Sequence, residues 1–205
     1  MPRVNTSADQ VVKAALGTLE DWLPVFIAEQ ERLEGRPQAE LPMPASYMGA
    51  ADRGTGRPED GYPRVAVIAL GLSGEPVRRA IGKYDLEFAL AAGVFLRGNS
   101  REEVRSMLTS YVSAIRNCLL HKGLGDLEAT MDFADESYDE SPADKARSLG
   151  GGEVAFSVMV ENAVVLGDPI FPEGPPDDPY EPIPDQPTIV VADVEVYPVP
   201  LNNRP

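Results

Sequence analysis

The composition of the chain changes at Gly167, and this change limits where a core can form. Residues 168–205 hold 11 of the 20 prolines in the 205-residue sequence, together with eight acidic residues and one basic residue, Arg204. A segment of this kind has too few apolar side chains to build a core of its own. We therefore predict one folded domain over residues 1–167 and an acidic, proline-rich, extended arm over residues 168–205.

One part of the arm has strand-forming character. Residues 188–196 are rich in β-branched side chains, and such a segment can add as a strand to the open edge of a partner's sheet. Its apolar members are therefore predicted interaction residues: Ile189, Val191, Val194 and Val196.

Charge and rare residues exclude several function classes. The 33 acidic and 18 basic residues give a net charge of −15, which repels nucleic-acid phosphates and disfavours specific DNA binding. Cys118 is the only cysteine and His121 the only histidine, so no intrachain disulfide, thiolate metal cage or multi-histidine site is possible. The longest apolar runs, residues 65–70 and 86–96, are too short to span a bilayer. We expect a non-enzymatic protein of cytoplasmic origin without cofactor, metal or membrane segment.

The first half of the chain predicts one long helix and one long loop. Apolar residues recur at helical spacing over residues 8–33, behind possible caps at Asn5, Thr6 and Ser7, with Pro24 marking a kink or a restart. Glycines and prolines then crowd residues 35–62, which we expect to form an extended excursion inside the domain.

The second half predicts strands on both sides of a second helix. Residues 63–70 and 83–97 have β-like patterns and are expected to share one sheet. Ser100 to Glu103 match a capping box, and an apolar stripe behind it continues to Gly123. Residues 127–133 and 154–160 alternate as further strands, and residues 141–149 suggest a short helix. The predicted fold class is α+β, with a small mixed or antiparallel sheet of about four strands packed by helices.

Three local patterns invite a chemical interpretation, and each has a simpler one. Cys118 and His121 are spaced to meet on one helix, but a small apolar residue and a helix-end base explain them as well. The acidic residues between 132 and 140 resemble an oxygen-ligand cluster for Ca²⁺ or Mg²⁺, yet they lack the glycine and register of an EF-hand and suit a solvated strand-to-helix connection. Residues 71–75 lack the spacing and the lysine of a phosphate-binding loop, which favours a hairpin-like connection.

Residues 71–160, taken in order, resemble the tail terminator, or tail completion, proteins of long-tailed bacteriophages, particularly those of actinobacterial hosts. The resemblance is carried by residues 71–78 before a β-segment; Ser100-Arg101-Glu102-Glu103 at a helix start; Tyr111-Val112-Ser113-Ala114-Ile115-Arg116 inside that helix; Asp135-Glu136-Ser137-Tyr138-Asp139; and the closing strand over residues 154–160. It spans less than half of the chain. The excursion and the acidic arm depart from the family pattern.

The resemblance implies a structural virion protein made in the host cytoplasm. Such subunits form a ring, commonly of six copies, which caps the tail tube, ends its polymerisation and joins the tail to the head-side connector. The implied partners are other copies of the chain, the tail-tube protein and the connector or stopper protein, while DNA passes through the ring without specific binding. Asp135, Glu136 and Tyr138 are predicted interaction residues.

Three alternatives stay open at this point, of which an enzyme is the last because the sequence offers no catalytic site for it. The first is a head-to-tail connector or stopper subunit of the neck, which also forms rings. The second is a non-viral binding module whose acidic, proline-rich arm recruits a basic or aromatic-grooved partner.

Overall fold

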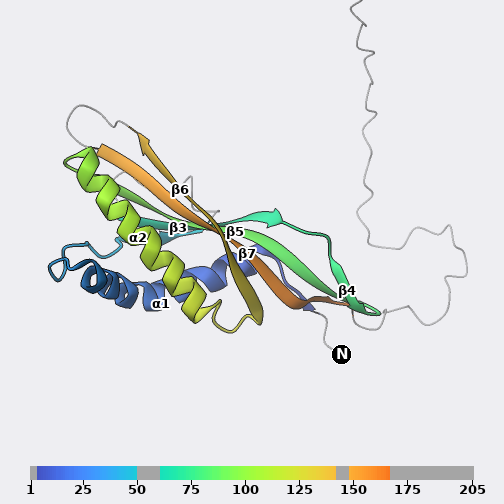
Figure 1. Cartoon of the computed structure of the whole chain (residues 1–205). Helices are drawn as coiled ribbons and strands as arrows, with labels where there is room; N and C mark the ends of the chain where they lie inside the picture. The colour runs from blue at the N-terminus through green and yellow to red at the C-terminus, as the bar shows by residue number, and fades with distance from the viewer. Residues whose placement is uncertain (1–3, 50–60, 142–147, 167–205) are drawn as a thin grey trace, which may run out of the picture. The chain divides into compact units, whose positions relative to one another are not determined.

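A computed structural model describes residues 4–49, 61–141 and 148–166 (Figure 1). These residues form two helices and seven strands. In chain order they are β1 (Val4–Asn5), α1 (Ala8–Glu34), β2 (Ser46–Met48), β3 (Arg64–Leu72), β4 (Val77–Ala80), β5 (Lys83–Gly98), α2 (Arg101–Lys122), β6 (Ala129–Ser141) and β7 (Ser148–Val165).

All seven strands belong to one sheet. Its main path runs β1-β7-β5-β3-β2, with β4 pairing with β5 and β6 pairing with β7. The pairs are antiparallel except for β2 with β3, which is parallel. The predicted α+β class with a mixed sheet is confirmed, but the expected number of about four strands is too low. The three additional strands, β1, β2 and β4, have two to four residues each, too few to show a period in the sequence.

The first helix begins and ends at the residues that the sequence indicates. Ser7 and Gln10 form a reciprocal capping box: the Ser7 N–H donates to Gln10 Oε1 at 2.8 Å, and the Gln10 N–H donates to Ser7 Oγ at 3.3 Å. The helix continues through Pro24 and ends at Gly35, whose φ of 67° is left-handed. The predicted helix over residues 8–33 is confirmed, and no restart occurs at Pro24.

The second helix is capped by Ser100, whose hydroxyl accepts the N–H of Glu103 at 3.1 Å. One stripe of this helix is buried, and the helix ends before Gly123, as predicted. Hydrogen bonds also join it to the end of α1. The Ser110 hydroxyl donates to Glu34 Oε2 at 2.7 Å, and Arg36 Nη2 donates to Ser106 Oγ at 2.6 Å.

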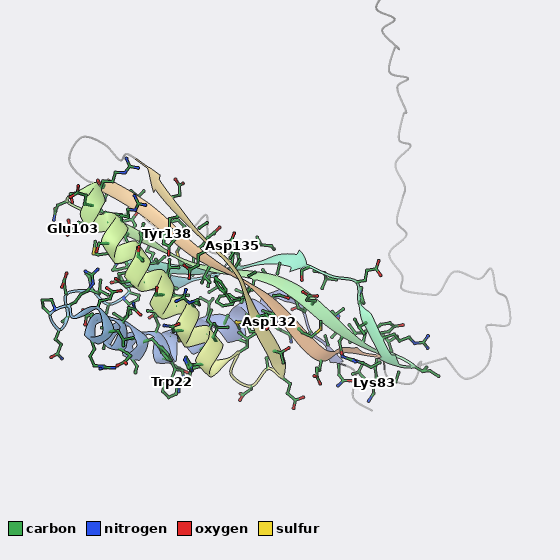
Figure 2. All side chains as sticks on the ribbon, viewed as in Figure 1. Trp22, Lys83, Glu103, Asp132, Asp135 and Tyr138 are labelled. Carbon is green, nitrogen blue, oxygen red and sulfur yellow. The ribbon has the colours of Figure 1, made fainter. Side chains whose placement is uncertain are left out.

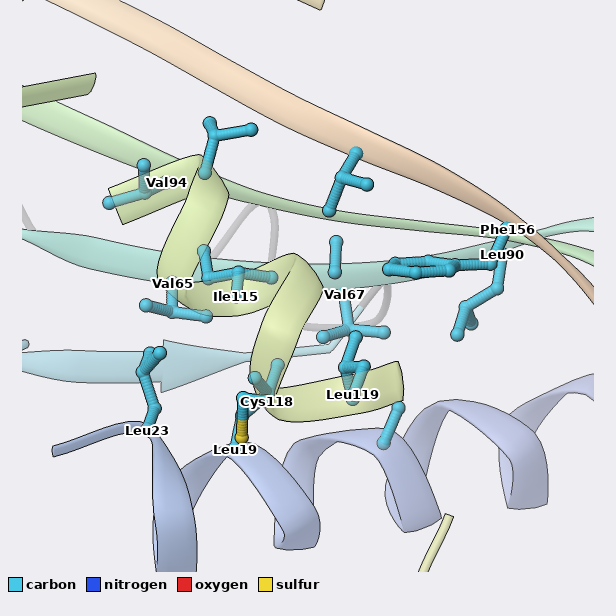
Figure 3. Packing of buried hydrophobic residues seen from close by; sticks show 14 of the residues in the cluster. Leu19, Leu23, Val65, Val67, Leu90, Val94, Ile115, Cys118, Leu119 and Phe156 are labelled. Atoms are coloured by element: carbon cyan, nitrogen blue, oxygen red, sulfur yellow. The ribbon is translucent and has the colours of Figure 1, made fainter. Parts of the chain in front are cut away.

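Both helices pack against the same face of the sheet. Alternate residues of the two long central strands point to this face and are buried with α1 and α2 in one core, among them Phe88, Leu90 and Val94 of β5 and Val154, Phe156 and Val158 of β7. Figure 3 shows Leu19 and Leu23 of α1 and Ile115, Cys118 and Leu119 of α2 around these strands. The period-2 pattern of β5 and β7 therefore marks the face that the helices cover.

Two glycines let α2 approach β7 closely. A Cβ atom on Gly150 would lie 2.6 Å from a methyl carbon of Val104, and one on Gly152 would lie 2.7 Å from a methyl carbon of Val112. These separations are well below van der Waals contact. Gly150 and Gly152 are thus requirements of helix packing at this end of the sheet.

The excursion predicted over residues 35–62 is only partly a loop. Glu31 is 3% exposed, and its carboxylate accepts the N–H groups of Leu41 at 2.7 Å and Ala39 at 3.1 Å, which ties this segment to α1. Leu41 is buried, and β2 follows at the edge of the sheet. Residues 50–60 lie outside the described residues.

The expected short helix over residues 141–149 is wrong at both ends. Ser141 is the last residue of β6 and Ser148 the first of β7, while residues 142–147 lie outside the described residues. The acidic residues that were expected in a strand-to-helix connection lie inside β6, which pairs with β7 along its whole length. At the described ends of the segment, pairing of Ser141 with Leu149 overrides the helix-forming tendency.

The arm predicted over residues 168–205 lies outside the described residues, and with it Ile189, Val191, Val194 and Val196. Within the described ranges, neither helix is long and apolar enough to cross a membrane.

Candidate interaction surface

The strand β6 is one edge of the sheet. It pairs with β7, and among the described residues no strand pairs with its other side. Asp132, Asp135 and Asp139 stand opposite Ser157, Ala155 and Gly151, so their side chains lie on the sheet face that the helices leave uncovered. All three aspartates are exposed. Figure 2 shows Asp132 and Asp135 along this strand.

The other two predicted interaction residues of β6 belong to the helix-facing side. Glu136 pairs with Arg116 of α2, and the Tyr138 hydroxyl donates to Glu136 Oε2 at 3.0 Å. Burial, followed by the Glu136 carboxylate, raises the pKa of Tyr138 to about 12. Glu136 therefore connects β6 to α2. Asp135 and Tyr138 keep exposed surface, with Tyr138 being 42% exposed.

The uncovered face of the sheet has a hollow of about 270 Å³. The strand register explains it, because small residues align in rows across the sheet. Gly93 stands opposite both Ala66 and Glu153, and Phe95 stands opposite Gly151. The walls are Ile68 and Phe95, and the rim on the β6 side is polar, with Ser137, Asp139 and Glu153.

The rim of this hollow is acidic. Glu153 accepts a hydrogen bond from the Ser137 hydroxyl at 3.1 Å, and Asp135 and Asp139 lie in the neighbouring rows. The hollow thus combines an apolar interior with negative charge on one side, an arrangement suited to a partner with an apolar side chain next to basic ones.

A second exposed surface is the hairpin formed by β4 and the start of β5. All residues of β4 are exposed, and Ile81 at the turn is 90% exposed. The turn has Gly82 at a φ of 72°. Arg78 and Lys83 flank Ile81, while Arg79 pairs with the buried Asp85. In Figure 1 this hairpin extends beyond both helices, and Figure 2 labels Lys83 there.

Other exposed apolar residues lie on the strands that lead to and from this hairpin. Leu70, Leu72, Val77 and Leu166 are all more than 40% exposed, and the Leu166 N–H donates to the Gly82 carbonyl at 2.7 Å. The sequence interpretation missed the hairpin because β4 has only four residues. A usable signal was present, since an isoleucine next to a turn glycine and surrounded by basic residues is unusual for a solvent-exposed turn.

The predicted connection over residues 71–75 joins β3 to β4. Within it, the Ser73 N–H donates to the Glu87 carbonyl at 2.9 Å, which holds the connection against β5. β3 and β5 belong to one sheet, as expected from the sequence, and the structure shows that they pair directly and antiparallel.

The two candidate reactive residues of α2 do not form a site. Cys118 is fully buried, its thiol lies 3.9 Å from the Thr18 carbonyl oxygen, and burial raises its pKa to about 12. The ring of His121 stacks on Phe26 with 6.0 Å between centroids. The described residues contain no group of three or more histidine, cysteine or acidic side chains placed to hold a metal ion.

The sequence matches no known protein-family model, and it matches no curated protein sequence.

Proposed function

We propose that this protein is a structural virion subunit of a long-tailed bacteriophage that forms a ring on the end of the tail tube. The ring ends tube polymerisation and joins the tail to the head-side connector or stopper protein. The role of the protein is structural, because each copy presents surfaces to the next copy, to the tube and to the connector.

The observation that carries the proposal is the uncovered face of the sheet. The helices cover only one face, and the other exposes the hollow between Ile68 and Phe95. The hairpin adds Ile81 and its apolar neighbours to the exposed surface. Exposed apolar side chains at two separate places on one domain suit a protein that binds other proteins. A subunit with two different exposed surfaces suits head-to-tail contacts, which close into a ring when the rotation permits.

The segments of the family resemblance supply additional support. They correspond to the connection into β4, the start and middle of α2, the second half of β6 and the central part of β7. Among the residues of the proposed contacts, these segments supply Arg78 of the hairpin and Asp139 on the rim of the hollow, while α2 packs on the opposite face of the sheet.

The acidic face of the sheet supports a role next to DNA without binding to it. Asp132, Asp135 and Glu87 point to this face and lie outside the lining of the hollow. Directed toward the channel of a ring, these carboxylates repel phosphates and let the genome slide past. In an assembled ring, a channel wall with net basic charge would contradict this orientation.

The experiment that tests the proposal is the oligomeric mass of the purified protein. Native mass spectrometry, alone and with the tail-tube protein of the same phage, is expected to detect a closed ring, alone or only on the tube end. Electron microscopy of capped tubes gives its position. A ring that binds the portal-side adaptor but not the tube would indicate a connector subunit. A monomer that binds neither the tail-tube protein nor the portal-side adaptor would favour the binding-module alternative.

A further inference from the structure

We infer that the β4–β5 hairpin of one copy docks in the hollow of the next copy, with Ile81 inserted between Ile68 and Phe95. This inference rests on the proposed assembly of the chain into rings and names the contact between neighbouring copies. It joins the two exposed apolar surfaces already described into one interface.

The shape of the two surfaces is complementary. Ile81 is 90% exposed at the tip of a narrow turn, so it projects as a single apolar knob. The hollow exists because Gly93 and Gly151 contribute no side chains to it, and its apolar walls are Ile68 and Phe95. Inserting one aliphatic side chain removes apolar surface from water on both partners.

The charges are complementary as well. On the hairpin, Lys83 pairs with Ala80, and Arg78 Nε donates to the Ala80 carbonyl at 3.4 Å, so both basic residues lie within three positions of Ile81. Asp139 and Glu153 lie on the rim of the hollow. Arg79 forms an ion pair with Asp85 of its own copy, so it is not part of the proposed docking contact. Opposite charges around an apolar centre fix the orientation of a partner and accelerate its association.

One copy cannot make this contact with itself. Lys83 pairs with Val165 of β7, whereas Gly93, at the floor of the hollow, pairs with Glu153. Twelve residues of extended strand separate Glu153 from Val165, a distance on the order of 40 Å. The hairpin and the hollow therefore lie far apart on the sheet, and their pairing is a heterologous contact between copies.

Two charge-reversed variants of the full-length protein test the contact. The hairpin variant is Arg78→Glu with Lys83→Glu, and the rim variant is Asp139→Lys with Glu153→Lys. Each variant alone places like charges at the interface, and we expect its ring to form only at concentrations at least about tenfold above those needed by the wild type. An equimolar mixture is expected to restore the ring, because each variant then meets the opposite charge on its neighbours.

Matched controls separate docking from general charge effects. Lys13→Glu with Arg32→Glu and Glu20→Lys with Asp21→Lys make the same changes in charge on the exposed side of α1. For the apolar knob, Ile81→Asp is compared with Leu33→Asp, at a position 62% exposed on α1. The controls are expected to assemble like the wild type, while Ile81→Asp loses the ring. Thermal melting of every variant verifies that the fold is intact.

Native mass spectrometry distinguishes failure of this contact from failure of the proposed function. If both charge variants, or Ile81→Asp, form rings at the same concentration as the wild type, the proposed contact is overturned and the ring function stands. A defect in the hairpin variant that the rim variant does not restore also overturns it. A wild type that never assembles, alone or with tail-tube protein, overturns both proposals.

Discussion

The carboxylate of Asp85 in β5 accepts a hydrogen bond of 2.8 Å from the backbone N–H of Asn162 in β7. Asn162 has a φ of 49°, in the left-handed region, at the irregularity where the register between the two strands shifts. Asp85 is 1% exposed and also pairs with Arg79 of β4. One buried side chain thus holds together three strands at the base of the hairpin.

Removal of this carboxylate is expected to destabilise the protein. Asp85→Ala leaves the Asn162 N–H without its acceptor in a buried position, which costs about 1–3 kcal/mol of unfolding free energy. Urea denaturation followed by circular dichroism measures the change. Asp132→Ala, at an exposed position, is the control and is expected to change stability by less than about 0.5 kcal/mol.

The same residue predicts a pH dependence. Arg79 and the Asn162 N–H hold the pKa of the Asp85 carboxyl below its usual value. The stability that the charged form contributes is therefore complete above the unfolded pKa of about 3.9 and is lost as the pH falls through the lower folded pKa. The difference in stability between wild type and Asp85→Ala is expected to shrink between pH 6 and pH 2. A difference that stays constant over this range would show that the charge is unimportant.

The close packing of α2 on β7 predicts that alanine substitution destabilises the protein more at one glycine than at its neighbour. Gly152→Ala places a Cβ atom against Val112 and is expected to cost about 1–3 kcal/mol through overpacking. Gly151→Ala points to the uncovered face, where its nearest contact is Phe95 at 3.4 Å, and is expected to cost less. Chemical denaturation measures the free energy of unfolding of each variant relative to the wild type. Equal losses would contradict the described approach of α2.

The buried thiol predicts slow chemical labelling. Cys118 is the only cysteine, its side chain is fully buried, and burial raises its pKa to about 12. At pH 8 we expect a thiol reagent to modify the native protein at least about a thousandfold more slowly than the protein in urea, because labelling requires opening of the core. Rapid labelling of the native protein would place Cys118 at an accessible surface instead.

Deletion of residues 168–205 tests the division of the chain. Because the described core lies entirely before residue 167, the truncated protein is expected to keep its thermal unfolding transition. Assembly with partner proteins is expected to weaken. Loss of the cooperative transition on truncation would mean that the arm is part of the folded domain.

The amino-acid sequence by itself determined the two helices and part of each long strand. Ser7 and Ser100 supply caps, Gly35 and Gly123 follow the helix ends, and apolar residues repeat at helical spacing between them. These are local interactions within a few residues of chain, so they can be recognised without knowing the fold. The composition change at Gly167 predicts the arm in the same way.

Only the tertiary structure decided where the candidate surfaces lie. The hollow exists because the register places Gly93 and Gly151 in neighbouring rows across β5 and β7, although they are 58 positions apart in the sequence. Asp135 and Glu136 are adjacent in the chain, yet pairing with β7 directs the first to the uncovered face and the second to Arg116 of α2. Strand register is set by long-range pairing and core burial. A single sequence therefore does not show which residues of neighbouring strands will stand opposite each other.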